Sequence, residues 1–424
     1  MIKYGILKRF LVIWTLYWLA NLLQPVHSIY PNIHLAVLLQ FVFVFVVTVF
    51  YVVMWHILNL KNPQIDQVME RFESKSLENL IQLGFFAGAL GLVFLLYDKV
   101  MYQGIDYTKG LALAREKWEV VSQQRNHGIS STFSVLGYLI GGAYFFPLSI
   151  SLCGFFAIKD SRRLLYICIG CFLLLAHSLI TGGRSSIILA VSLSTFGYFD
   201  SKKFGTLFKN KFFNKYLRVI LLVIFFYLIY VFYSRANKGG VNAAQYGIEF
   251  LEYLGLKPYG WFETFCATTP FGGLFSLLNL TLSYLAHSLA STAAIIYNDG
   301  FGGGDAVFAY FYSLGFKIGL TNPPVEWFLA GRFPSLPGAI YMQFGVVGIL
   351  LMACILGVFS AVSVRWFSAH PRSFFLFGLC ATMESILVLS PFLFAGDLLF
   401  FPFAILGGLF LINIRVIAQR IKHE

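Results

Sequence analysis

Three arginines beside glycine and proline are the side chains of this sequence best suited to holding a phosphate group. Arg184 lies in a Thr-Gly-Gly-Arg-Ser-Ser turn between two apolar segments, and Arg235 and Arg332 lie near the two ends of a long segment. A guanidinium binds phosphate oxygens through two parallel hydrogen bonds, and glycine lets the backbone approach a ligand closely. With Lys238, which follows Arg235, these residues predict a site for an anion such as a pyrophosphate.

Two histidines and one carboxylate within an apolar stretch are further candidates for chemistry. His177 lies one turn before the glycines of the Arg184 turn, and His287 lies in an apolar stretch of the long segment. An imidazole near neutral pH can act as a base or donate a hydrogen bond to phosphate, although a lone histidine on an apolar helix also fits a structural role. Glu384 lies within another apolar stretch, where a carboxylate is usually either functional or paired.

The elements that carry these side chains are predicted to be membrane helices. Hydrophobic residues make up 58% of the 424 positions and charged residues only 12%, whereas soluble domains carry about 25% charged residues. A helix needs about 20 mostly apolar residues to cross the hydrocarbon core. Segments that reach or approach this length are 10–29, 33–58, 79–97, 132–157, 164–181, 185–199, 217–233, 337–364, 374–392 and 398–414. The sequence therefore predicts an all-α polytopic membrane protein with about ten to twelve transmembrane helices.

The distribution of Lys and Arg predicts the orientation of these helices. Basic residues gather in alternate loops, most densely between Lys202 and Arg218, and the positive-inside rule places those loops and both termini in the cytoplasm. This placement explains most of the net charge of +12 without a nucleic-acid partner. Arg184, Arg235 and Arg332 fall at the outer face against this trend, although each alone also fits a cation that reaches from a helix end to the interface.

The spans predict two transmembrane bundles separated by one large external loop. Residues 1–233 hold about seven spans, 234–337 form the external, periplasmic loop, and 338–424 hold about three spans. The loop is rich in aromatic residues, which argues against disorder, and loops of this length are usually functional. Its apolar stretch 272–297 fits a re-entrant or membrane-inserted helix.

Sequence motifs for a metal, a nucleotide or a catalytic serine are absent. The sequence has no P-loop, no His-Glu-x-x-His, no Gly-x-Ser-x-Gly and no zinc-type spacing of cysteine and histidine. The first external loop, 24–32, contains no carboxylate. Metal-dependent lipid-linked glycosyltransferases of the oligosaccharyltransferase type typically carry acidic residues there, so this class is disfavoured. We expect neither a metal site nor a cofactor.

The order of several features along the chain is typical of one family. The features are the many spans, a Gly-Gly-Arg-Ser turn before an apolar span, a dominant external loop with an arginine near each end, and a Phe-Pro-Ser-Leu-Pro-Gly run (333–338) that enters a later span. In these features, which cover most of its length, the chain resembles the Wzy family of bacterial polysaccharide repeat-unit polymerases. Some members place a glycine eleven residues after an external arginine. Here the corresponding glycines are Gly247 and Gly345, one and two positions later.

The resemblance implies transfer of a growing glycan from undecaprenyl pyrophosphate onto a new lipid-linked repeat unit. This reaction takes place at the outer face of the bacterial cytoplasmic, or inner, membrane. The implied partners are the lipid-linked oligosaccharide, the bilayer and a chain-length regulator membrane protein. An O-antigen ligase, which uses the same donor with a lipid A core acceptor, stays open as an alternative. A lipid-linked glycan flippase or transporter also stays open, although it favours internal repeats and short, even loops.

The resemblance also assigns roles to the candidate residues. The arginines suit stabilisation of the leaving pyrophosphate, and a histidine or glutamate of the external loop suits deprotonation of the acceptor hydroxyl. The expected catalytic residues are Arg184, Arg235, Arg332, His287 and Glu326, and the expected substrate-binding residues are Lys238, His177 and Tyr341. The enzyme is expected to be a metal-independent membrane glycosyltransferase.

Overall fold

The protein is an all-α polytopic membrane protein, as its sequence predicts. The computed structural model describes residues 4–61, 75–109, 131–154, 158–181, 185–201, 242–298, 333–370 and 373–393, with single residues between these ranges and a few between 401 and 408. Within these ranges nearly every residue is helical, and the only sheet is a short two-stranded one.

Six described helices are long and apolar enough to cross a membrane, and a bent pair would add a seventh. The expected number of about ten to twelve is not reached within the described residues. Two of the expected spans, 217–233 and 398–414, lie almost entirely outside them. The expected spans 185–199 and 374–392 are helices of 17 and 16 residues.

The bundle helices follow the apolar segments of the sequence. Their bounds are α1 (Gly5–Leu23), α2 (Ile33–Lys61), α3 (Lys75–Tyr97), α5 (Thr132–Gly141), α6 (Phe145–Ser151), α7 (Asp160–Thr181), α8 (Ser185–Ser201), α16 (Leu336–Ala369) and α17 (Phe374–Leu389). Short helical turns continue two of them, namely η1 (Asp98–Tyr102) after α3 and η3 (Gly142–Tyr144) between α5 and α6, while η2 (Tyr107–Lys109) stands alone. Ser131 and Ser373 are the N-cap residues directly before α5 and α17, where their hydroxyls accept hydrogen bonds from backbone N–H groups of the first turn.

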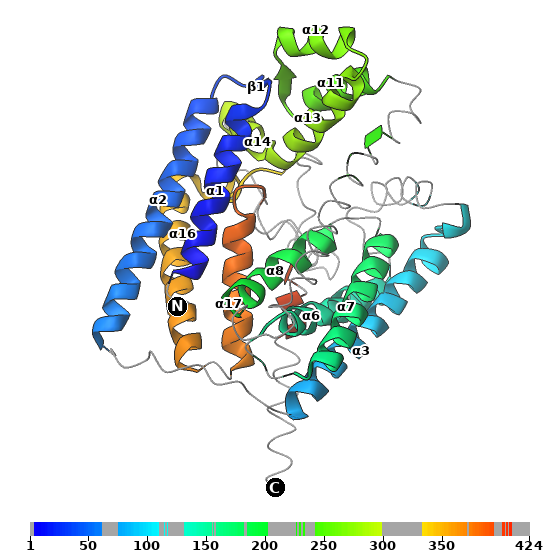
Figure 1. Ribbon diagram of the computed structural model, residues 1–424, viewed down its shortest axis with the longest axis vertical. Helices are drawn as coiled ribbons and strands as arrows, with labels where there is room; N and C mark the ends of the chain where they lie inside the picture. The colour runs from blue at the N-terminus through cyan, green and yellow to red at the C-terminus, as the bar shows by residue number, and fades with distance from the viewer. Residues whose placement is uncertain are drawn as a thin grey trace.

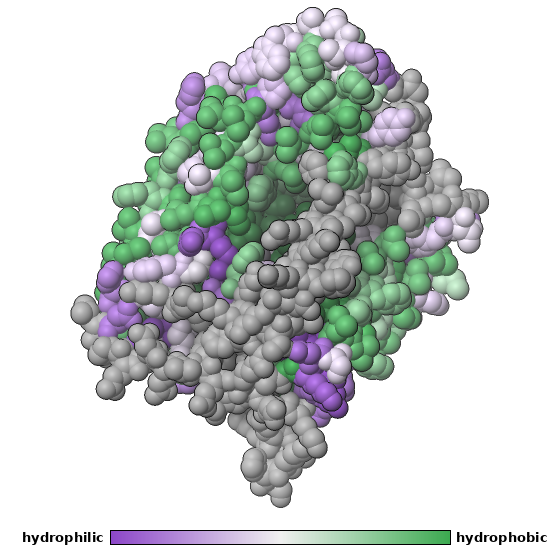
Figure 2. Space-filling model, in the orientation of Figure 1, coloured by the Kyte–Doolittle hydropathy of each residue, from purple (hydrophilic) through white to green (hydrophobic). Residues whose placement is uncertain are grey.

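Figure 1 shows two groups of membrane helices beneath a cap. Helices α1, α2, α16 and α17 form one group, and α3, α6 and α7 belong to the other. Helix α8 lies between them and packs on α17, α6 and α7. Apolar side chains cover the outward faces of both groups, which appear green in Figure 2. These faces suit contact with lipid chains.

Close approach of α3 and α5 depends on glycine. A Cβ atom at Gly91 would lie 2.3 Å from the backbone nitrogen of Gly141, and one at Gly137 would lie 2.7 Å from the Leu95 side chain. Small residues let membrane helices pack with their backbones in contact, which replaces the hydrophobic driving force that lipid cannot supply.

The bounds of the first and third predicted spans need correction. Helix α1 covers residues 5–23 rather than 10–29, because Pro25 disfavours helical geometry in the residue before it and the chain continues as strand β1 (Val26–Ser28). The predicted span 79–97 continues beyond its expected end, because residues 98–102 extend α3 as one π-helical turn, η1, in which Asp98 and Lys99 are buried.

A helical cap occupies most of the described part of the predicted external loop. It consists of α11 (Ala243–Tyr253), strand β2 (Leu256–Pro258), α12 (Gly260–Thr268), α13 (Gly272–Ala286) and α14 (Ser288–Tyr297). The antiparallel pairing of β1 with β2 aligns Val26 with Pro258 and Ser28 with Leu256, so it joins the cap to the chain directly after α1. The apolar stretch 272–297 becomes α13 and α14, which meet at a 60° bend.

The register of β1 and β2 predicts a specific cross-link. Backbone hydrogen bonds join Ile29 to Gly255 and Tyr259 to Pro25. In an antiparallel pair, hydrogen-bonded and non-hydrogen-bonded residue pairs alternate, so Ser28 and Leu256 form a non-hydrogen-bonded pair, in which the side chains are closer together. The double variant Ser28→Cys/Leu256→Cys should form a disulfide under mild oxidation, detected as a linked peptide by mass spectrometry. His27→Cys/Leu256→Cys is the control, because neighbouring strand residues point to opposite faces. Equal linking of both pairs would contradict this register.

Candidate functional site

The predicted site residues divide into two sets. Five lie outside the described residues, namely Arg184, Arg235, Lys238, Glu326 and Arg332. The other three are described: His287 lies in the cap at the bend between α13 and α14, His177 near the end of α7, and Tyr341 in the second turn of α16. Each of these three side chains therefore comes from a different element of the fold.

His287 links the cap to the chain that enters α16. Its Nδ1 lies 2.6 Å from the carbonyl oxygen of Tyr284, and its Nε2 lies 3.1 Å from the backbone nitrogen of Phe333. A carbonyl can only accept and a backbone N–H can only donate. The geometry therefore assigns a neutral imidazole whose Nδ1–H donates to Tyr284 and whose Nε2 accepts from Phe333. Phe333 follows Arg332 in the sequence, so His287 fixes the chain beside one of the predicted arginines.

A buried polar cluster continues from this bend into the bundle. The Ser288 hydroxyl lies 2.7 Å from the Tyr17 hydroxyl of α1 and also donates to the carbonyl of Pro391. One turn further along α14, the Thr292 hydroxyl lies 3.0 Å from that of Ser335, which also accepts a hydrogen bond from Gln40 of α2. We call these residues, together with Ser390, which accepts from Trp14, the polar junction.

The polar junction fixes how the cap sits on the membrane helices. Its hydrogen bonds connect α14 with α1, α2 and the chain entering α16, and the backbone N–H of Leu336 donates to the Ser390 carbonyl just beyond α17. Buried hydroxyls and amides are costly unless they are hydrogen-bonded. Because partners come from several separate segments, the junction favours one arrangement of these segments over others.

The two remaining described candidates are partly or fully enclosed. His177 is fully buried, and its Nδ1 lies 3.0 Å from the hydroxyl of Tyr144 while its ring packs against Phe145. Tyr341 is half-buried and packs near Ala294 and Ile295 of α14. The assignment of both to substrate binding stays a prediction.

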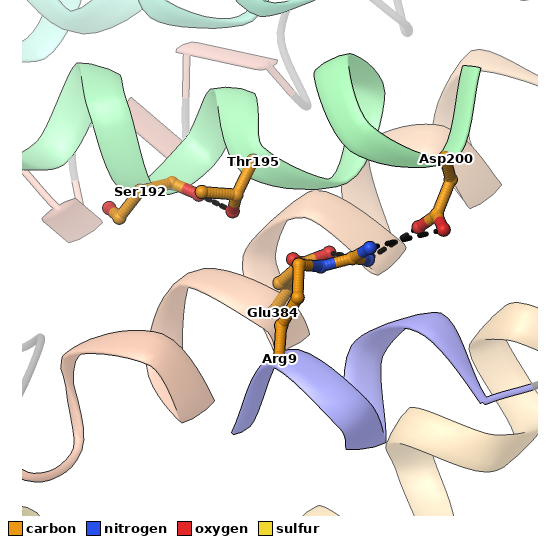
Figure 3. A network of polar contacts seen from close by, with 5 residues as sticks. All are labelled: Arg9, Ser192, Thr195, Asp200 and Glu384. Carbon is orange, nitrogen blue, oxygen red and sulfur yellow. Dashed lines mark hydrogen bonds and ion pairs between the residues drawn. The ribbon is translucent and has the colours of Figure 1, made fainter. Parts of the chain in front are cut away.

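An ion-pair network that the sequence analysis did not assemble lies inside the bundle (Figure 3). Arg9 of α1 lies between Glu384 of α17 and Asp200 of α8. Its Nη2 is 2.9 Å from one Glu384 oxygen, its Nε contacts the other, and its Nη1 is 3.1 Å from Asp200. The guanidinium therefore binds both carboxylates through two N–H groups each, and its carbon lies 5.7 Å from the centre of the Phe199 ring.

Neighbouring residues fit closely around this network. Glu384 is fully buried, and the hydroxyls of Ser192 and Ser385, 2.7 Å apart, join α8 to α17 beside it. A Cβ atom at residue 5 would lie 2.4 Å from an Asp200 oxygen, so Gly5 leaves the room that the carboxylate occupies. The sequence had marked Glu384 as functional or paired, and the structure shows that it is paired. The sequence alone singles out Glu384 but not Arg9.

A second charged cluster lies at the end of α3 nearer the cap. The Gln103 amide donates to Asp98 over 2.7 Å and accepts from Lys99 over 3.1 Å, while the Ser131 hydroxyl donates to the other Asp98 oxygen over 2.6 Å. The π-helical turn η1 turns these side chains inward, and such turns recur at functional sites. The only sequence signal was two adjacent charges at the end of an apolar span.

Tyr107 brings this end of α3 next to the end of α7. Its hydroxyl donates to the carbonyl of Ile180 over 2.7 Å. Burial raises the pKa of Tyr107 to about 12, because the phenolate would lose hydration there. The hydroxyl therefore stays protonated at neutral pH and keeps this hydrogen bond, close in sequence to the Arg184 turn.

Comparison with known proteins identifies no relative of this chain: no protein-family model, no curated protein and no solved structure matches it. Within the described residues, no three His, Cys, Asp or Glu side chains lie close enough together to hold a metal ion.

The ion-pair network should be essential for stability. The change Arg9→Ala leaves two carboxylates facing each other in a buried site, and removal of one partner from a buried pair costs about 3–5 kcal/mol. We expect a large loss of folded protein, measured by thermal unfolding and size-exclusion chromatography in detergent. The triple variant Arg9→Met/Asp200→Asn/Glu384→Gln removes all three charges and should recover most of that loss.

The exposed Arg162–Glu78 pair provides the control for this experiment. Arg162 has 57% of its side chain exposed, and surface ion pairs contribute about 0–1 kcal/mol. Arg162→Ala should therefore leave the unfolding temperature close to that of the original protein. An Arg9→Ala protein as stable as the Arg162→Ala protein would contradict the structural role of the network.

Proposed function

We propose that this protein is a membrane glycosyltransferase that polymerises lipid-linked glycan repeat units at the outer face of a bacterial cytoplasmic membrane. The observation that carries the proposal is the bond from Phe333 to His287. This bond ties an ordered cap, which packs on membrane helices, to the residue that follows Arg332. A polyprenyl-pyrophosphate substrate has a tail in the bilayer and a charged head at its surface. An enzyme for it therefore needs cationic groups where a surface cap meets lipid-exposed helices.

The exposed side of α13 suits contact with such a substrate. Phe271, Leu274, Leu282 and Leu285 recur at helical spacing and are exposed, so the cap presents an apolar stripe. The opposite side of α13 packs on α11 and α1. A cap with one apolar side at the membrane surface can contact a lipid tail while its polar residues contact sugars.

The proposed reaction has a defined balance of bonds and protons. A hydroxyl of the new repeat unit attacks the anomeric carbon of the growing glycan, and the bond from that carbon to the pyrophosphate oxygen breaks. Arg184, Arg235 and Arg332 neutralise the charge that develops on the leaving undecaprenyl pyrophosphate, and Lys238 contributes to its binding. The hydroxyl proton passes to a base. His287 can accept it at Nε2 only when its bond to Phe333 opens, whereas Glu326 is the alternative base.

Two observations favour a second candidate, a transporter for the same lipid-linked glycan. Helices α13 and α14 form a helix broken by 60°, and Arg9, Asp200 and Glu384 place charges inside the bundle. Broken helices and intramembrane charges are typical of transporters. In this ion-pair network, however, the charges neutralise one another, which supports a structural role and makes the transporter the weaker candidate.

Deletion of the gene distinguishes these activities in cells. Loss of a polymerase should leave single repeat units on the final acceptor and abolish long chains, detected by gel electrophoresis of the extracted polysaccharide. Loss of a ligase would instead remove all attached units while long chains accumulate on the carrier lipid. Loss of a flippase would trap repeat units on the cytoplasmic face. Either of the last two outcomes would overturn the proposal.

Single changes of the three arginines test the mechanism. Changing Arg184, Arg235 or Arg332 to Ala should abolish polymerisation without lowering the protein level, since loss of an arginine contact to a developing phosphate charge can cost on the order of a thousandfold in rate. Changing each to Lys should restore only part of the activity, because an ammonium lacks the bidentate geometry. The assay measures chain length in isolated membranes supplied with lipid-linked repeat units.

A matched control and a chelator complete that experiment. Lys257→Ala removes one exposed positive charge from β2 of the cap and should leave the rate unchanged. Polymerisation should persist in EDTA. Full activity in all three Ala variants, or complete loss in EDTA with rescue by magnesium, would refute the arginine clamp.

A further inference from the structure

The end of the bundle opposite the cap carries a polar notch between α3 and α7. Its volume is about 440 Å³, and its lining residues are Glu78, Asn79, Gln82, Arg162, Leu165 and Tyr166. A volume of this size holds roughly fifteen water molecules, at about 30 Å³ each, so a small polar group fits inside. None of these residues takes part in the proposed transfer reaction, and the notch does not depend on it.

The charged and hydrogen-bonding side chains of the notch are complementary to a zwitterionic ligand, which carries one positive and one negative group. Arg162 contacts the Glu78 carboxylate through Nη1, yet its side chain is 57% exposed, so other guanidinium N–H groups face solvent. Gln82 donates from its amide to the Tyr166 hydroxyl over 3.1 Å, and Asn79 beside it is exposed. A guanidinium binds phosphate, a carboxylate binds an ammonium, and amides bind ester or hydroxyl oxygens.

On the faces of α3 and α7 that line the notch, the side chains nearer the cap are apolar. On α3, Phe86 is exposed one to two turns beyond Asn79 and Gln82, and on α7, Leu165 and Phe172 are exposed beyond Arg162. These positions share one face of each helix because they recur every three or four residues. Figure 2 shows hydrophilic residues at the lower end of the molecule directly beside hydrophobic ones. A polar end followed by an apolar face matches the shape of a phospholipid.

We propose that the notch binds the headgroup of phosphatidylethanolamine, with the lipid chains lying along α3 and α7. Arg162 binds the phosphate and Glu78 binds the primary ammonium. The Arg162–Glu78 ion pair therefore opens, and the negative and positive groups of the headgroup take the places of the two side-chain partners. Asn79 and Gln82 bind the oxygens between them. An anionic headgroup without an ammonium would meet repulsion from Glu78, and a trimethylated headgroup would offer Glu78 no N–H donor.

Lipid competition on the purified full-length protein tests this assignment. The protein is placed in phosphatidylcholine nanodiscs and titrated with phosphatidylethanolamine or phosphatidylglycerol of the same chains, and retained lipids are counted by native mass spectrometry. The original protein should retain phosphatidylethanolamine preferentially. Arg162→Ala and Glu78→Gln should each weaken that retention about tenfold, the effect expected when a hydrogen bond to a charged group is lost. The reversed pair Glu78→Arg/Arg162→Glu should restore part of it.

Matched controls separate the notch from general surface charge. Lys257→Ala and Glu249→Gln remove one exposed charge of each sign in the cap and should leave lipid retention unchanged. Equal retention of all three lipids would refute the site. Preferential retention of phosphatidylglycerol that increases in Glu78→Gln would also refute it, because the notch would then bind an anionic lipid that Glu78 opposes. Unfolding temperatures in pure phosphatidylcholine establish that each variant is folded.

Discussion

A charged group inside a membrane bundle must find its counter-charge within the protein, and this constraint determines how α1, α8 and α17 meet. Arg9 satisfies it by binding Glu384 and Asp200 at once. The guanidinium geometry then fixes the rotation of all three helices, since two carboxylates must face it in bidentate fashion. Because α8 also packs on α6 and α7, the contact sets the position of one helix group relative to the other.

The same rule, applied to uncharged groups, explains the polar junction. Tyr17, Ser288, Thr292 and Ser335 are buried where no lipid could accept their hydrogen bonds, and each finds a partner on another segment. Hydrogen bonds of this kind have a preferred direction and length, whereas apolar contacts between helices tolerate sliding. The hydrogen bonds therefore fix the position of the bend at His287 on the bundle, and the cap packs directly against the ends of the membrane helices.

Hydropathy was enough to predict the fold class and most described spans, because the length of an apolar run is a local property of the sequence. The predicted span 33–58 and helix α2 agree closely for this reason. The partners of Arg9 could not be predicted in this way, since they lie 191 and 375 residues away, and no local pattern records such a distance. The strand pair also escaped prediction, because each strand has only three residues. Of the candidate site, His287, His177 and Tyr341 gained specific environments, while the arginines stay predictions.

The span of the Arg9–Glu384 contact has a consequence for how the chain is made. Arg9 is synthesised 375 residues before Glu384, its carboxylate partner on α17. At about 5–20 residues per second, the interval is roughly 20–75 seconds. Throughout that time α1 carries an incompletely neutralised cation, and for the first part of it β1 also lacks its partner strand β2. Helix α1 therefore cannot complete its packing before α17 has been inserted. A chain that stops before α17 leaves Arg9 with Asp200 but without Glu384, so α1 is held less firmly in such an unfinished copy.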